Sequence, residues 1–199
     1  SNQGNNNVAV GALALDKNAV ANNNAAVGTL ALACNTTGAS NVAVGFQALN
    51  SNTTASNNVA VGEDALKDTT TGCQNIAMGR NALEDNSTGD LNVALGYNAL
   101  KTNTTADQNT AVGANALLAN TTGCRNIAIG YNSLAVNTTG CCNVSIGRAS
   151  LDANIDGDFN TAVGTNSLSG NTTADGNTAI GYLAMNSTTT GGYNTTLGL

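Results

Sequence analysis

Residues 109–125, NTAVGANALLANTTGCR, are preceded by 92–108, NVALGYNALKTNTTADQ, and followed by 126–142, NIAIGYNSLAVNTTGCC. The three stretches align without a gap, so the chain repeats itself every 17 residues. No linker or insertion interrupts the series, which predicts one continuous repeat domain over residues 1–199 without recognisable caps. Position 1 of the repeat is always Asn: Asn7, Asn24, Asn41, Asn58, Asn75, Asn92, Asn109, Asn126, Asn143, Asn160, Asn177 and Asn194.

Position 5 is always Gly, which indicates a corner that needs a positive φ or a close approach of two backbones. Position 4 is always a large aliphatic residue or Met, and position 9 is Leu until Met185. Gly, β-branched residues and Asn-Thr-Thr clusters all disfavour a helix and favour short strands joined by turns. The corner glycines are Gly11, Gly28, Gly45, Gly62, Gly79, Gly96, Gly113, Gly130, Gly147, Gly164, Gly181 and Gly198.

The constant repeat length predicts that each unit forms one coil lying directly over the last. We therefore expect an all-β fold, a parallel β-solenoid or β-roll with 17-residue coils. About twelve coils spaced about 4.8 Å apart would make a rod roughly 55 Å long.

Stacked coils place each Asn of position 1 over its own copy, so amide groups can pass hydrogen bonds along the rod axis. We expect such a ladder throughout position 1 and nearly throughout position 12. The Asn residues of position 12 include Asn35, Asn52, Asn86, Asn103, Asn120, Asn137, Asn154 and Asn171.

Positions 2, 3 and 4, for example Val42, Ala43 and Val44, are all apolar, so the alternation of a half-buried strand is missing. We expect positions 4 and 9, together with position 2, to line the interior in rows such as Val44, Val61 and Val112. The small Ala of position 3 would then point outward, where a second solenoid packs against it. The alternative is a row of Ala side chains tolerated in water.

Composition excludes several classes of function. The net charge is -6, and the six Lys and Arg residues are scattered, so no basic patch is available for nucleic acid. No apolar run approaches the roughly 20 residues of a membrane-spanning helix, so membrane insertion is not expected. The chain has no His, and its carboxylates occupy variable positions without a recurring pair, so we expect neither catalytic residues nor a cofactor.

One short stretch resembles the first half of a calcium-binding loop: Asp152, Asn154, Asp156 and Asp158, with a Gly between the last two. The Glu that such a loop needs is replaced by Val163. Because Asn154 belongs to the repeat itself, a drifted repeat without metal is the preferred interpretation.

Five Cys residues are irregularly placed. Cys124 and Cys141 share position 16 in successive coils, so their Cα atoms should lie about 5 Å apart, within disulfide range. An odd count leaves at least one thiol free or paired with another chain. Cross-links between subunits and inert thiols both remain open.

Thr recurs at positions 13 and 14, which suggests an ice-binding face. Adjacent residues of a strand face opposite sides, so only one Thr column would face solvent unless the segment is a turn. Turn-forming Thr is therefore preferred. The Thr residues are Thr36, Thr53, Thr70, Thr104, Thr121, Thr138, Thr172 and Thr189 at position 13, and Thr37, Thr54, Thr71, Thr88, Thr105, Thr122, Thr139, Thr173 and Thr190 at position 14.

The strings Asn109-Thr-Ala-Val-Gly113 and Asn126-Ile-Ala-Ile-Gly130 resemble the N-x-A-[IV]-G repeats of YadA-type trimeric autotransporter adhesin heads. The form with Asn-Thr-Thr-Gly resembles arrays in phage tail-fibre-like and bacterial surface proteins. The resemblance covers essentially the whole chain. It implies a left-handed parallel β-roll, often trimeric, that acts as a shaft or a host-binding head.

Together these features predict a structural or adhesive fibre protein, extracellular or on a cell or virion surface, that self-associates laterally or end to end. The expected partners are further copies of the chain and a host-surface glycan, on which the aromatic residues of position 6, such as Tyr97 and Tyr131, could stack. Simple surface decoration is the alternative for these aromatics. An ice-binding solenoid that uses the Thr columns is the alternative function.

Overall fold

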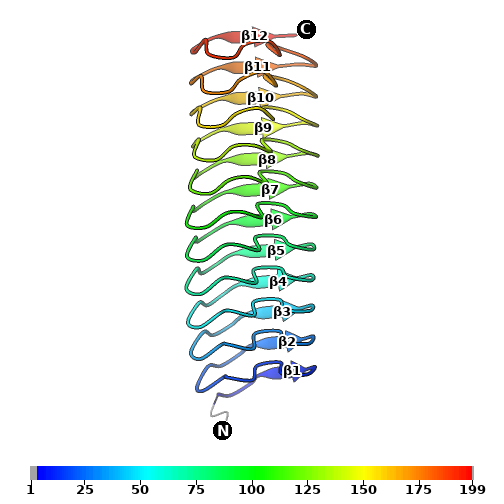
Figure 1. Ribbon diagram of the computed structural model, residues 1–199, viewed down its shortest axis with the longest axis vertical. Helices are drawn as coiled ribbons and strands as arrows, with labels where there is room; N and C mark the ends of the chain where they lie inside the picture. The colour runs from blue at the N-terminus through cyan, green and yellow to red at the C-terminus, as the bar shows by residue number, and fades with distance from the viewer. Residues whose placement is uncertain (1–3, 199) are drawn as a thin grey trace.

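The computed structural model, which describes residues 4–198, is a rod in which twelve parallel strands pair in sequence order (Figure 1). The described residues contain no helix. The prediction of an all-β parallel solenoid is confirmed, with about eleven turns of about 17 residues. The strands are β1 Val8–Val10, β2 Ala25–Val27, β3 Val42–Val44, β4 Val59–Val61, β5 Ile76–Met78, β6 Val93–Leu95, β7 Thr110–Val112, β8 Ile127–Ile129, β9 Val144–Ile146, β10 Thr161–Val163, β11 Thr178–Ile180 and β12 Thr195–Leu197.

Every strand pairs with the next at a register shift of one repeat. Val42 lies opposite Val59 and Val44 opposite Val61, and the same relation holds in all pairs from β1 to β12. Like residues therefore lie over like residues along the whole sheet, and β1 and β12 lie at opposite ends of the rod (Figure 1). The in-register stacking predicted from the repeat is confirmed.

The predicted interior position of position 9 is confirmed, but the predicted directions of positions 2, 3 and 4 are wrong. Ala43, at position 3, is 0% exposed, whereas Val42 and Val44 are each 37% exposed. Val44, Val61 and Val112 do share a row, but that row lies on the outside of the sheet. Because side chains alternate along a strand, an inward position 3 forces positions 2 and 4 outward. The narrow interior, already filled from the opposite wall, leaves room for a methyl group only.

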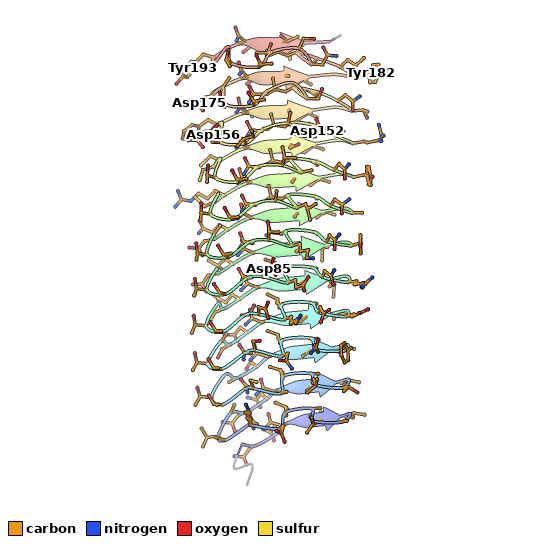
Figure 2. The ribbon with its side chains drawn as sticks, in the orientation of Figure 1. Asp85, Asp152, Asp156, Asp175, Tyr182 and Tyr193 are labelled. Carbon is orange, nitrogen blue, oxygen red and sulfur yellow. The ribbon has the colours of Figure 1, made fainter. Side chains whose placement is uncertain are left out.

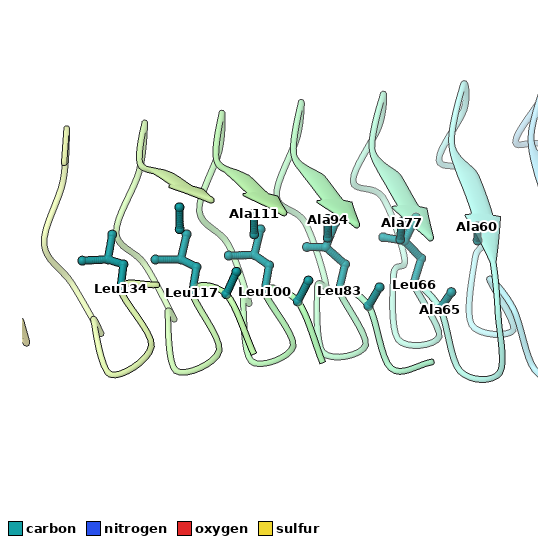
Figure 3. Close-up of a cluster of buried hydrophobic side chains, with 14 of the residues drawn as sticks. Ala60, Ala65, Leu66, Ala77, Leu83, Ala94, Leu100, Ala111, Leu117 and Leu134 are labelled. Carbon is teal, nitrogen blue, oxygen red and sulfur yellow. The ribbon is translucent and has the colours of Figure 1, made fainter. Parts of the chain in front are cut away.

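The opposite wall of the interior is made by positions 8 and 9. Figure 3 shows Leu66, Leu83 and Leu100 stacked in a row beside the Ala residues of the strands. The position-9 Leu residues from Leu32 to Leu168 are fully buried. Burying each Leu side chain stabilises the fold by about 1.5–3 kcal/mol, which makes this row the main apolar contribution of each coil.

These core residues have an unusual backbone. From Leu15 to Met185, every position-9 residue has φ between 50° and 54°, the left-handed region that L-residues rarely occupy. This conformation costs about 1–2 kcal/mol per residue. The burial of the same side chain offsets that cost, and Leu and Met, which are not branched at Cβ, tolerate the conformation better than a β-branched residue would.

The glycines of position 5 form the corner that follows each strand. From Gly11 to Gly181 their φ lies between 128° and 141°, which is open almost only to Gly. A Cβ atom on Gly113 would also lie 2.6 Å from the carbonyl oxygen of Gly130 in the next coil. Both a positive φ and a close approach between backbones therefore require Gly here.

Candidate interaction surface

The two Asn columns stabilise the rod in different ways. At position 12, Asn120 Nδ2 donates to Asn103 Oδ1 at 3.0 Å and to Gly123 O at 2.8 Å, so amides do bond to amides. At position 1, Asn109 Oδ1 instead accepts the backbone N–H of Asn126 at 2.9 Å, while its Nδ2 donates to Gly123 O.

Amide-to-amide bonds at position 1 occur in only some coils of the described region. Asn92 donates to Asn75 at 3.2 Å, and the pairs Asn143–Asn126 and Asn194–Asn177 behave alike. The expected amide ladder throughout position 1 is therefore wrong in detail. The side-chain oxygen of each position-1 Asn instead accepts the backbone N–H of the position-1 Asn in the next coil. This bond recurs along the column.

A third set of ladders involves position 16. The side chain there accepts the backbone N–H of position 16 in the preceding coil, as Ser56 Oγ does from Ala39 at 3.0 Å and Asp90 Oδ1 does from Cys73 at 2.6 Å. Sequence reasoning missed this role. The signal was present, since position 16 is mostly filled by Asn, Ser, Cys or Asp, all small side chains with an acceptor atom.

This role explains two of the cysteines. Cys73 Sγ accepts the N–H of Ser56 at 3.4 Å, and Cys141 Sγ accepts the N–H of Cys124 at 3.1 Å. All five Cys side chains are free thiols and half-buried. The structure also brings Cys124 and Cys141 together, with their sulfur atoms 3.2 Å apart.

The four residues of the calcium candidate do not form a site. Asn154 Oδ1 accepts from Asn171 Nδ2 at 2.8 Å inside the rod, and Asp158 Oδ1 accepts the N–H of Cys141. Asp156 is exposed at position 14, apart from Asp152 (Figure 2). Within residues 4–198, no three His, Cys, Asp or Glu side chains are grouped closely enough to hold a metal ion.

The two Thr columns are not equivalent. At position 13, Thr36 Oγ1 donates to Thr53 O at 2.8 Å, and Thr121 Oγ1 donates to Thr138 O at 3.0 Å. These hydroxyl groups therefore hold one coil to the next. Only position 14, with residues such as Thr37 and Thr122, presents a Thr column to solvent.

Ion pairs gather on a few coils in the N-terminal half. Glu84 contacts Lys67 at 3.6 Å and Lys101 at 3.2 Å, and Arg80 contacts Glu63 at 3.3 Å. None of these residues belongs to positions 2 or 4, which carry no ionisable side chain in any coil.

The largest regular surface of the rod is the outer sheet face, which we define as positions 2 and 4 of β1 to β12. It consists of Val, Ile, Leu, Met, Ala and Thr side chains in two straight columns. Met78 and Ile180, for example, are 45% and 42% exposed. The aromatic side chains of position 6 are exposed next to it in sequence: Phe46, Tyr97, Tyr131 and Tyr182.

No family model, curated protein or solved structure matches this chain. The strand register and the Asn ladders alone identify the fold as a parallel β-solenoid.

The described residues contain no cavity that could enclose a small ligand and no helix suited to crossing a membrane. What the rod offers to a partner is a continuous surface. On chemical grounds the outer sheet face is the candidate functional site, since large continuous apolar patches on a protein surface usually mark a contact.

Proposed function

We propose that this solenoid is part of an extracellular fibre or adhesive shaft on a cell or virion surface, in which two copies pack side by side through their outer sheet faces. The observation that carries the proposal is the pair of outward-facing columns, apolar apart from four Thr residues at position 2, without a single charge along all twelve strands. Exposed sheet faces of soluble proteins are normally polar, so a face of this kind favours a partner.

The size of the face fits a protein partner. Twelve strands about 4.8 Å apart, each of three residues at about 3.3 Å per residue, cover about 500 Å². Two copies would bury about 1,000 Å² in total, the lower limit for a specific interface. The exposed position-6 residues, for example Tyr97, would add area at the margin.

A second copy of the chain is the partner that the face fits best. Its rows recur at the strand spacing, about 4.8 Å, and another solenoid of the same kind repeats at the same interval. Side chains of one copy can then pack between the rows of the other along the entire rod. The absence of charges in positions 2 and 4 means that two identical faces meet without repulsion between like charges.

The repeat motifs support the same class of protein. The resemblance of Asn126-Ile-Ala-Ile-Gly130 to adhesin head repeats, and of the Asn-Thr-Thr-Gly form to tail-fibre-like arrays, favours a shaft with an adhesive partner such as a host-surface glycan. A left-handed coil and end-to-end stacking of the rods belong to the same proposal.

The test compares the oligomeric state of matched variants by sedimentation equilibrium. The variant Val44→Lys/Val112→Lys places two charges on the outer sheet face. The control Thr54→Lys/Thr122→Lys places them at exposed position 14 of the same coils. We expect the natural chain and the control to associate and the first variant to be monomeric. A monomeric natural chain at high concentration would contradict the proposal.

Ice binding is the second candidate function. The outer sheet face suits this function better than the Thr columns do. Val, Ile and Thr side chains form a flat grid with fixed spacing along and between the strands, and the ladders hold it rigid. Thermal hysteresis of the purified monomer would support this function. A stable dimer without hysteresis would leave lateral association as the function, because the dimer covers the grid.

A further inference from the structure

We propose that Cys124 and Cys141 form an intrachain disulfide that links two successive coils of the rod covalently. This inference is independent of lateral association, since both residues lie at position 16 and outside the outer sheet face.

The geometry brings the two sulfur atoms together before any bond forms. They are 3.2 Å apart, so about 1.2 Å of approach gives the bond length of a disulfide. The backbone beside them is held in register, because the N–H of Cys142 donates to the carbonyl oxygen of Cys124 at 3.0 Å. A change of side-chain torsion angles can therefore close the bond without moving the strands.

The other cysteines are not placed for this bond. Cys73 lies three coils below Cys124, roughly 14 Å away along the rod. Cys34 lies at position 11, where its sulfur atom is 3.9 Å from the Lys17 amino group. Among the described residues, Cys124 and Cys141 are the one pair of sulfur atoms in contact.

The chemistry requires an oxidant, for which we name a small-molecule disulfide such as oxidised glutathione. One protein thiolate attacks the glutathione disulfide, forms a mixed disulfide and releases one glutathione thiolate. The second protein thiolate then attacks the protein sulfur and releases the other glutathione. Two protein thiols lose two protons and two electrons, and the electrons reduce one oxidised glutathione to two thiols.

Burial of Cys141 raises its pKa, so little thiolate is present at neutral pH. Closure should therefore be faster at mildly alkaline pH. Once closed, the bond encloses one coil and restricts the unfolded chain more than the folded one. Local opening of residues 124–141 should then cost more free energy than in the reduced chain.

The test counts thiols. The reduced chain is incubated with oxidised glutathione, denatured, and titrated with a thiol reagent, and the linked peptides are identified by mass spectrometry. We expect two of the five thiols to disappear, leaving three, and the linked peptides to contain Cys124 and Cys141.

The Cys124→Ser variant separates loss of the disulfide from misfolding. Ser56 already fills position 16 as an acceptor, so the fold should be kept, which circular dichroism verifies. We expect this variant to form no intrachain disulfide. The Cys73→Ser variant should form the Cys124–Cys141 disulfide as the natural chain does. Five thiols remaining after incubation, or Cys124 linked to a second chain, would overturn the proposal.

Discussion

Thr69 lies next to Asn52 in the position-12 column and leaves the buried Oδ1 of Asn52 without a hydrogen-bond partner. In neighbouring coils that oxygen accepts from the amide of the following Asn, as Asn86 Oδ1 does from Asn103 at 2.7 Å. The hydroxyl of Thr69 is also buried and unpaired. The column is therefore interrupted at this coil.

Completing this column should stabilise the protein. Thr69→Asn supplies an amide that can donate to Asn52 and to the backbone, so we expect the free energy of unfolding to rise by about 1–3 kcal/mol. Urea denaturation measures the change. The control Thr71→Asn, exposed in the same coil, should stay within about 0.5 kcal/mol. Equal effects of both substitutions would argue against the interrupted column.

The corner glycines should tolerate no side chain. Gly113→Ala forces an unfavourable φ and brings a Cβ within 2.6 Å of Gly130 O, so we expect a loss of about 3 kcal/mol or more. Ala114→Val, at the half-exposed neighbouring position, should change stability by less than about 1 kcal/mol. Thermal unfolding of the two variants gives the comparison, and a mild effect at Gly113 would contradict the corner geometry.

The inward direction of position 3 predicts opposite outcomes for neighbouring residues. Ala77→Val adds two methyl groups to a filled interior and should cost about 1–3 kcal/mol. Ile76→Thr, on the outer sheet face where Thr110 and Thr161 occur naturally, should cost clearly less. Chemical denaturation measures the loss of stability in both variants. A larger loss for Ile76→Thr than for Ala77→Val would contradict the inward direction of position 3.

The carboxyl group of Asp152 should make the stability of the fold depend on pH in the acid range. Burial raises the pKa of Asp152 above its ordinary value, so the folded state holds that proton to higher pH than the unfolded state. Its contribution to stability is therefore lost as pH rises from the ordinary Asp pKa through the raised one. Asp152→Asn should be more stable than the natural chain at neutral pH, with the difference vanishing in acid. Denaturation midpoints at both pH values test this, and a difference independent of pH would contradict it.

The repeat made the coil and its register predictable, because a constant 17-residue spacing leaves no other stacking of Val44 on Val61. It did not predict which side of the strand is buried. Val42, Ala43 and Val44 are all apolar, so polarity carries no information, and only the limited interior volume opposite the Leu row decides.

Other features left traces that were not recognised. Asn at position 7, as in Asn98 and Asn115, is typical of positive φ, and both residues have φ near 55°. The position-9 leucines gave no such warning, since Leu rarely adopts φ near 50° and does so here to reach the core. The apolar surface became visible only with side-chain directions, because sequence alone assigned Val44 to the interior.

The register between coils also governs how such a protein can change in length. Removing one whole unit, such as residues 92–108, would join Leu91 to Asn109 and leave every column continuous, with a rod shorter by one rung. Removing one residue fewer would turn the following strands by one position and send their valines into the core. The rod can therefore lengthen or shorten only by whole coils. Duplication or loss of the gene segment for one coil is the smallest step that preserves the architecture.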